Sequence, residues 1–389
     1  MSYRADPDFL QKLKKYGPVN IESCFNCGNC TAICPLSTDT DNFPRRVIRL
    51  AQLGLEDRLL ESKELWSCYY CGECSQTCPR EADPGEFMAT ARRYAIARYD
   101  RFGLARLLYT SPVFNIIFLV VLAVFFGWFL YSQSDSMPSG ELDLFAFIPS
   151  ELIHNLGLIA GGIIAVTALT GMVTMAINVS KAANFPEGTR LNWWGALWDT
   201  LVKEVLGQNR YRQDCERYGS DAPWYLRKWY LHATVLWGFI GLFVATALNY
   251  LLELIGVKPT GTWMPLWNPI RLLGTIAGLS LVYGATMLIV NRLKKKDESY
   301  QHSMPSDWSF LLLMWLAGVT GFVLEIAIYL PQPHAWSYWG LLVHLVVVGE
   351  LLLLAPFTKF AHAVYRSIGL YIAALKPLPE REKASAAAD

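Results

Sequence analysis

Eight cysteines near the start of the chain form two copies of one metal-binding motif. Both copies read CxxCxxCxxxCP, and they place Cys24, Cys27, Cys30 and Cys34 in the first and Cys68, Cys71, Cys74 and Cys78 in the second. Three thiolates spaced in this way can hold three corners of a 4Fe-4S cube, while the fourth, which precedes proline, ligates the other cluster. The spacing therefore predicts one cluster held by Cys24, Cys27, Cys30 and Cys78, and a second held by Cys68, Cys71, Cys74 and Cys34.

Structural zinc is the main alternative for paired cysteines, but such a site uses four ligands in two pairs. Here two sets of four share one internal spacing, which favours clusters. The ninth cysteine, Cys215, stands alone among charged residues and is interpreted as a free thiol. The first residues are charged and lack the apolar core of a secretory signal. We therefore expect the cysteine-rich head to stay in the reducing cytoplasm, where disulfides are rare.

The elements that must position these cysteines are predicted to be helices. Pro44 opens a helical pattern in the spacer between the motifs, where apolar residues recur at helical spacing. Gly28 and Gly72 each follow the second cysteine of a motif, and a residue without Cβ lets the backbone approach a cluster closely. We predict an all-α fold that begins with a helical dicluster ferredoxin domain over residues 1–108.

Long apolar runs dominate the chain beyond the head. Each run is close to the ~20 residues that cross ~30 Å of hydrocarbon. The predicted membrane domain covers residues 109–375 and contains six transmembrane helices that form a haem b bundle. The expected spans are about 112–131, 152–178, 229–252, 269–291, 308–330 and 338–358.

The distribution of Lys and Arg predicts how this bundle is oriented. These residues are concentrated in the loop 179–228 and in the segment 292–307, and they are scarce in the other loops. By the positive-inside rule, the basic loops face the cytoplasm. The prediction is a multi-pass protein of the cytoplasmic membrane with the head and both termini inside the cell and a polar tail over 376–389.

Within the long basic loop, the sequence LNWWGALWDTLVKEVL has the pattern of an amphipathic helix. Its apolar side chains at helical spacing are Trp194, Leu197, Trp198, Leu201 and Val205. Such a helix lies either along the inner membrane surface or against protein, and the pattern fits both interpretations equally.

Four histidines of the membrane domain fall at two depths. His344 and His362 are 18 residues apart, which is five helical turns or about 27 Å on one helix face. His154 begins the second span on the outer side, and His232 begins the third span on the inner side. The expected pairs are His154 with His344 and His232 with His362. Two imidazoles from different helices make a six-coordinate haem that transfers electrons, so the pattern predicts two haems b.

A single histidine at a helix end is commonly an interfacial polar residue, and it is the match in depth that favours ligation. His302 and His334 lie in loops and are the substitute ligands. Charged residues inside the spans suggest function because burying charge in lipid is costly. Arg271 could meet a haem propionate, and Glu325 or Glu350 could carry a quinol proton. Structural pairing between helices explains these charges equally well.

These motifs resemble known families of redox proteins. The head, with its two CxxCxxCxxxCP motifs and helical spacer, is similar to the small iron-sulfur subunit of heterodisulfide reductases. The membrane part, with His344 and His362 near its end, resembles the haem b subunits of respiratory nitrate reductase and of membrane-bound heterodisulfide reductase. The nitrate reductase family takes its other two ligands from one helix, where this chain has only His232, so the assignment of His154 departs from the family pattern.

The fusion of both parts over nearly the whole chain resembles the membrane subunits of quinone-interacting membrane-bound oxidoreductase (Qmo) complexes of sulfate-reducing prokaryotes. The resemblance implies menaquinone as the membrane substrate and heterodisulfide-reductase-A-like flavoprotein subunits as cytoplasmic partners. It also implies adenylyl-sulfate reductase as the downstream acceptor in sulfate respiration.

The expected function is electron exchange between menaquinone and these partners through two haems b and two 4Fe-4S clusters. The chain would be the quinone-reactive subunit of an oxidoreductase complex and would need its partners for a complete reaction. The alternatives are a related heterodisulfide-reductase-like or sulfite-reduction complex, and a membrane anchor without quinone chemistry. A net charge of +1 provides no basic field for nucleic acid.

Overall fold

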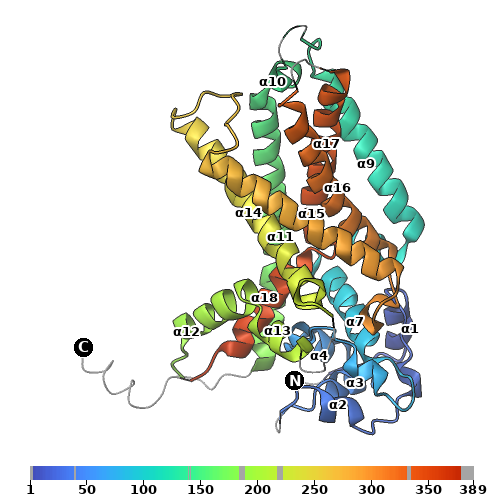
Figure 1. Cartoon of the computed structure of the whole chain (residues 1–389). Coiled ribbons are helices and arrows are strands. Elements are labelled where there is room, and N and C mark those ends of the chain that lie inside the picture. The colour runs from blue at the N-terminus through green and yellow to red at the C-terminus, as the bar shows by residue number, and fades with distance from the viewer. Residues whose placement is uncertain are drawn as a thin grey trace, which may run out of the picture.

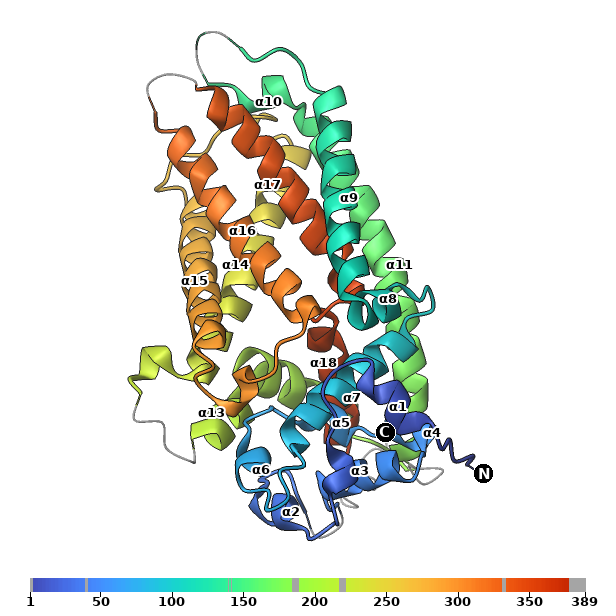
Figure 2. The same ribbon diagram turned by 90° about the vertical axis from the view of Figure 1, so that its right-hand side faces the viewer.

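The computed structural model describes residues 3–38, 41–138, 140, 142–183, 189–216, 222–330 and 334–377, with the backbone alone at 214–216. These residues form helices and loops, with isolated β-bridges and no strand within the described ranges. The predicted all-α fold with a transmembrane bundle is confirmed. Figures 1 and 2 show an elongated molecule in which a small N-terminal head lies at one end of a bundle of long helices.

The head consists of short helices gathered around one longer helix. Its helices are α1 (Phe9–Lys14), α2 (Asn29–Ile33), α3 (Arg45–Gln52), α4 (Glu56–Leu60), α5 (Glu64–Ser67), α6 (Glu73–Gln76), α7 (Pro84–Tyr99) and α8 (Leu104–Thr110). The two cysteine motifs fold alike, because Gly28 and Gly72 immediately precede α2 and α6 with φ values of 90° and 95°. Glycine is favoured in this conformation, which explains its presence in both motifs.

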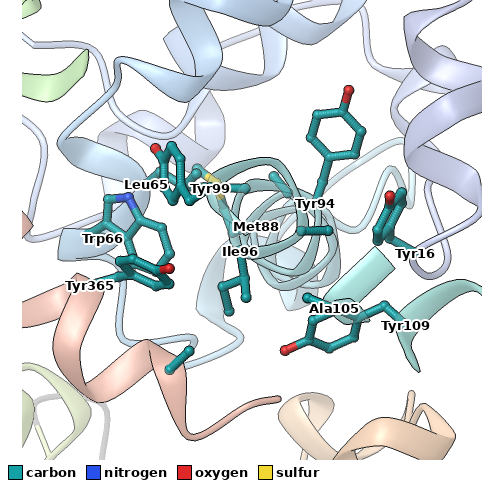
Figure 3. Close-up of a cluster of buried hydrophobic side chains, with 14 of the residues drawn as sticks. Tyr16, Leu65, Trp66, Met88, Tyr94, Ile96, Tyr99, Ala105, Tyr109 and Tyr365 are labelled. Carbon is teal, nitrogen blue, oxygen red and sulfur yellow. The ribbon is translucent and has the colours of Figure 1, made fainter. Parts of the chain in front are cut away.

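The core of the head includes a helix from the opposite end of the chain. Figure 3 shows Met88 and Ile96 of α7 beside Trp66, Tyr99 and Tyr365. The Tyr365 ring, on α18 (Ala361–Ala374), lies 5.5 Å from the Trp66 ring and 5.4 Å from the Tyr99 ring. The same buried cluster continues into the long helices. The head and the bundle therefore share one hydrophobic core.

Within the described residues, six helices are long and apolar enough to cross a membrane, as predicted. They are α9 (Pro112–Ser132), α11 (Ser150–Ala183), α14 (Lys228–Leu254), α15 (Pro269–Leu293), α16 (Pro305–Ala327) and α17 (Ala335–Leu353). Helices α14 and α15 approach closely at Gly238 and Gly284, where an added Cβ would lie 2.7 Å from Leu281 N and 2.4 Å from Thr234 Oγ1. Small residues commonly permit such contacts between membrane helices.

The last predicted span ends earlier than the sequence suggested. Helix α17 ends at Leu353, and a 3₁₀ turn over Ala355–Phe357 leads into α18. His344 and His362 therefore lie on different helices, so the prediction that they share one face of a single helix is wrong. Pro356 cannot donate a helical hydrogen bond, and Thr358 is extended with φ −116° and ψ −169°. Together these residues end one helix and redirect the chain.

The long loop contains the predicted helix. Helix α12 (Trp193–Trp198) continues into a π-helical stretch over Asp199–Leu206. The other short elements are α10 (Leu144–Phe147), α13 (Asn209–Glu216) and 3₁₀ turns over Ile21–Ser23, Trp224–Leu226 and Glu298–Tyr300. The side chain of Cys215 and residues 378–389 of the predicted tail lie outside the described residues.

Candidate metal centres

The structure brings cysteines of the two motifs close to one another. The thiols that interact with the buried Cys30 include those of Cys24, Cys27 and Cys78. The thiols that interact with Cys74 are those of Cys68, Cys71 and Cys34, together with that of Cys30. Burial raises the pKa of both Cys30 and Cys74, and the neighbouring thiols raise it further. Cys30 and Cys74 thus each have the fourth cysteine of the other motif among their neighbours. The division of the eight cysteines into two ligand sets stays a prediction.

The chemistry of each set fits a 4Fe-4S cluster. Four thiols match the four iron corners of the cube, and backbone amides already point at sulfur. The amide of Tyr70 donates to Cys68 Sγ, and that of Ala82 donates to Cys78 Sγ, both at 3.4 Å. Such hydrogen bonds help to set a cluster's reduction potential. Among the described residues, no three His, Cys, Asp or Glu side chains are placed to bind one metal ion together. A 4Fe-4S cube does not require this, because each of its four irons is bound by a different cysteine.

A cavity of about 240 Å³ lies between the second cysteine set and the membrane bundle. The head contributes Cys68 and Tyr69 to its lining, and helices α14 and α18 contribute His232 and His362. One cavity therefore touches both kinds of candidate ligand that the sequence predicts, a cluster cysteine and a pair of histidines.

The His232 and His362 rings lie 6.4 Å apart, measured between their centroids. His232 Nδ1 donates to Gln208 Oε1 at 3.1 Å, and His362 Nδ1 donates to the backbone carbonyl of Lys359. Because both partners are acceptors, each ring carries its proton on Nδ1 and keeps a lone pair on Nε2. Burial lowers the pKa of His362 to about 3, so this ring is neutral near pH 7.

This geometry fits a metal held between two axial imidazoles. A metal–imidazole bond is about 2.0 Å and the ring centroid lies roughly 1 Å behind the nitrogen, so two such rings are separated by roughly 6 Å. Metal-bound histidines usually donate their other N–H to a carbonyl or carboxylate, as both rings do here. Arg92, Lys359 and Arg366 also line the cavity and could pair with anionic propionates. The structure brings the predicted inner pair together, and its ligation of a haem stays a prediction.

Gln208 is a residue of this site that the sequence did not reveal. It follows the π-helical stretch with φ of 49°, and its side chain is buried against His232. Its Nε2 atom has no hydrogen-bond partner among the described residues. Left-handed conformations of residues other than glycine often mark functional positions. Its role depends on a tertiary contact, and the local sequence carries no signal for it.

Two arginines join the second cysteine set to the cavity. Arg92 Nη1 and Arg366 Nη1 each donate to the backbone carbonyl of Cys68 at 2.7 Å. Arg366 comes four residues after His362, so the two lie on the same face of α18. That spacing was a signal from which Arg366 could have been predicted.

Aromatic side chains continue this connection as far as the histidines. The Arg366 guanidinium lies 4.2 Å from the centre of the Tyr69 ring. Tyr69 stacks on Tyr211 with 5.5 Å between centroids, and Tyr211 meets the His232 ring edge-on, also at 5.5 Å. Side chains in contact therefore link the residue after Cys68 to the candidate axial ligand.

A buried ion network fastens the head to the bundle beside this cavity. Arg93 of α7 donates to Glu86 at 2.9 Å and to Asp307 of α16 at 3.1 Å. Lys359 lies 3.0 Å from the other oxygen of Asp307. The Asp307 side chain is only 2% exposed. Buried charges persist when they are paired in this way, so the network fixes how the head sits on the membrane helices.

At the far end of the bundle, no contact joins the rings of the predicted outer pair, whose residues are both described. His154 Nε2 lies 3.7 Å from Glu253 Oε2, and the His154 ring packs 4.7 Å from that of Tyr250. His344 Nδ1 lies 2.8 Å from Thr320 Oγ1, so Nε2 is the nitrogen of this ring that Thr320 leaves available. The pairing of His154 with His344 stays a prediction.

The other predicted residues have different surroundings. Arg271 and Glu325 form an ion pair at 2.9 Å, which is the structural pairing named as the alternative to a functional role. Glu350 is 5% exposed, and its Oε1 has no hydrogen-bond partner in the described part of the chain. His302 lines the large cavity, and His334 directly precedes α17.

The fold and its cysteines define a class of protein, a helical iron-sulfur domain joined to a membrane-helix bundle. Residues 20–82 match the family described as a 4Fe-4S dicluster domain. Residues 106–387 match the family described as citrate utilization protein B. Because this match covers most of the chain, the protein belongs to the citrate utilization protein B family.

Curated relatives resemble separate parts of the chain. Citrate utilization protein B of Escherichia coli is 30% identical over 155 residues, which cover 39% of this chain and 38% of that protein. A subunit of the H(2):CoB-CoM heterodisulfide,ferredoxin reductase of Methanothermobacter thermautotrophicus is 39% identical over 61 residues, or 16% of this chain and 33% of that protein. An iron-sulfur subunit of the CoB--CoM heterodisulfide reductase of Methanopyrus kandleri is 38% identical over 69 residues, or 16% of this chain and 36% of that protein.

The predicted resemblance to the small heterodisulfide reductase subunit is thus confirmed. The chain spans about a third of the length of these relatives. No solved structure matches the chain.

Proposed function

We propose that this protein is a membrane electron-transfer subunit that exchanges electrons between menaquinone and cytoplasmic flavoprotein or iron-sulfur partners. One observation carries the proposal: a single cavity is lined by Cys68 of the second cysteine set and by the neighbouring rings of His232 and His362. When bound, 4Fe-4S clusters and haem b would each accept and release one electron.

The residues of the chain would hold these groups and shape their surroundings. The two cysteine sets would ligate the clusters, and His232 and His362 would ligate a haem at the head end of the bundle. Arg92 and Arg366 place positive charge beside both sites. A second haem would use His344, whose Nε2 is not engaged by Thr320, with His154 as the predicted partner.

The orientation in the membrane, the quinone and the soluble partners in this proposal are inferred from the sequence. The charge distribution of the loops favours the cytoplasm for the head and both termini. The resemblance to Qmo membrane subunits favours menaquinone, heterodisulfide-reductase-A-like flavoproteins and adenylyl-sulfate reductase. Glu350, a buried carboxyl group with an oxygen that no described residue bonds, is a better candidate for quinol protons than Glu325, which is paired with Arg271.

A second candidate function follows from family membership. The match over residues 106–387 and the relative in Escherichia coli favour a part in citrate utilisation. Combined with the proposed electron transfer, this part would be to connect a soluble redox partner of citrate utilisation to menaquinone. The membrane chemistry is the same in both candidates, and the soluble partner differs. Reoxidation of the menaquinol-reduced complex by adenylyl sulfate with its reductase would support the first candidate, and its failure would favour the second.

The metal content of the purified chain tests the cofactor assignment. We expect about eight cluster irons and about eight acid-labile sulfides per chain, because each 4Fe-4S cube contains four of each. Haem should be present, and a menaquinol analogue should reduce it. About four cluster irons or fewer would contradict the two-cluster head, and haem that quinol cannot reduce would support the membrane-anchor alternative.

Replacing Gln208 with leucine should weaken haem binding at the His232 and His362 site. The substitution removes the acceptor that orients His232, and such changes typically cost about 10-fold to 100-fold in metal affinity. Haem titration of the apoprotein would measure the affinity, and spectroelectrochemistry would measure the potential. Gln208→Glu keeps an acceptor and is the matched control. Equal affinities for wild type, Gln208→Leu and Gln208→Glu would rule out this role for Gln208.

A further inference from the structure

The helical segment Trp193–Leu206, formed by α12 and the π-helical stretch, lies beside α18 at the head end of the bundle, as Figure 1 shows. One face of this segment packs on protein. Ala196 and Thr200 are buried on that face, and the Trp193 ring lies 6.3 Å from the ring of Tyr371 on α18. The segment is therefore held against the fold and is not a free arm.

The remaining face carries large apolar side chains that no part of the described chain covers. Trp194 is 82% exposed, Trp198 is 62% exposed and Leu201 is 44% exposed. Their spacing of four and three residues places them in one stripe along the helix. The flank of the stripe is polar, with an exposed ion pair between Asp199 and Lys203 at 2.5 Å. Contiguous exposed apolar surface of this kind marks an interaction site.

The segment that carries this stripe is also bonded to an exposed tryptophan of a helix long and apolar enough to cross a membrane. Trp237 of α14 donates from its indole N–H to the backbone carbonyl of Leu206 at 3.1 Å, and its own ring is 48% exposed. Trp224 and Tyr225, just before α14, are also exposed. Tryptophan and tyrosine gather where a membrane meets water, because their rings are apolar and their N–H or O–H groups are polar. The head end of the bundle thus has an aromatic belt that includes the segment.

We propose that Trp194, Trp198 and Leu201 form an interfacial anchor that is immersed in the lipid headgroup region at the head end of the bundle. The occupant of this surface is the bilayer, because the segment is bonded at Leu206 to Trp237, whose exposed ring belongs to the candidate membrane span α14. The polar flank and the aromatic character match helices that lie in the membrane plane. The anchor depends on the membrane spans and is independent of the proposed redox function.

The anchor also has a structural consequence. The segment that it holds continues through Leu206 to Gln208, which bonds His232, and it carries Glu204, whose carboxylate accepts a hydrogen bond from Tyr69 at 3.1 Å. Lipid contact at Trp194 and Trp198 would therefore fix the position, along the membrane normal, of Glu204 and Gln208, which line the cavity.

Spin labelling of the full-length protein with its clusters assembled tests the anchor. In a Cys215→Ser background, in which the cluster cysteines are ligated, a nitroxide would be attached at Trp194→Cys or at Leu201→Cys. The protein would be placed in nanodiscs of phosphatidylcholine and phosphatidylglycerol. Collision rates with oxygen, which partitions into lipid, and with a nickel chelate, which stays in water, would then be compared. Phe125→Cys on the exposed face of α9 is the lipid control, and Lys15→Cys on the head is the water control.

We expect the oxygen-to-nickel ratio at Trp194 and Leu201 to exceed that at Lys15 and to approach that at Phe125. A ratio equal to that at Lys15 would place the stripe in water and overturn the proposal. Low collision rates with both reagents would show that protein covers the stripe and would overturn it equally. Cluster absorbance of each labelled variant would verify that the head is intact.

Discussion

Replacing His362 with alanine should remove about one haem per chain and leave the iron-sulfur content unchanged. The substitution deletes one of two imidazoles whose centroids are 6.4 Å apart, and a six-coordinate haem needs both axial ligands. The cysteine sets belong to the head and do not include this residue. Haem absorbance and low-spin electron paramagnetic resonance would report the loss, and iron and sulfide assays would report the clusters.

His302→Ala is the matched control for this experiment. His302 lines the same cavity, but it pairs with Asp83 at 3.4 Å and its side chain is 42% exposed. We expect this variant to keep its haem. His232→Ala should reproduce the loss seen with His362→Ala, which guards against a defect specific to α18. Full haem content in both the His232 and His362 variants would refute the assignment of this pair.

Replacing Asp307 with asparagine should destabilise the junction between the head and the bundle by about 1.5–3 kcal/mol, because it removes charge-assisted hydrogen bonds to a buried carboxylate. Lys359 would lose its carboxylate, which lies 3.0 Å away, and Arg93 would lose one of its two carboxylates, at 3.1 Å, while it keeps Glu86. The stability would be measured by denaturant titration in detergent. Amide hydrogen exchange in α7 should become faster as stability is lost, because the network holds that helix against α16.

Asp199→Asn is the matched control, because it removes the same charge from an ion pair that is exposed to solvent. Asp199 pairs with Lys203, but both side chains are more than half exposed, and such pairs contribute at most about 1 kcal/mol. The double variant Asp307→Asn with Lys359→Met should recover part of the lost stability, because it removes the cation that loses its carboxylate and leaves Arg93 paired with Glu86. Equal effects of Asp307→Asn and Asp199→Asn would show that the network does not hold the head in place.

The sequence predicted best where chemistry depends on neighbours along the chain. Cluster cysteines lie a few residues apart, so spacing alone predicted two crossed sets, and Cys30 and Cys74 each have the fourth cysteine of the other motif as a neighbour. The six spans followed from run length and apolarity for the same reason. Gly28 and Gly72 were expected to let the backbone approach a cluster closely. Their positive φ values add a local reason for glycine at both positions.

Prediction was weaker where distant segments meet. Counting five turns from His344 to His362 assumed one unbroken helix, and the turn at Pro356 makes that assumption wrong. His362 nevertheless meets His232, because α18 folds into the head instead of continuing through the membrane. The sequence left open whether Arg271 and Glu325 have a functional role or pair with another helix. The packing of α15 against α16 shows that they pair with each other.

The sequence by itself determined the eight cysteines, the six membrane helices and the set of histidines from which ligands could come. Each of these depends on residue type and local spacing, which the chain carries directly. Only the tertiary structure decided that Cys68 and the two histidines border one cavity, that Gln208 orients His232, and that Asp307 joins the head to the bundle. Those contacts bring together residues far apart in the chain, and their geometry is set by how whole helices pack.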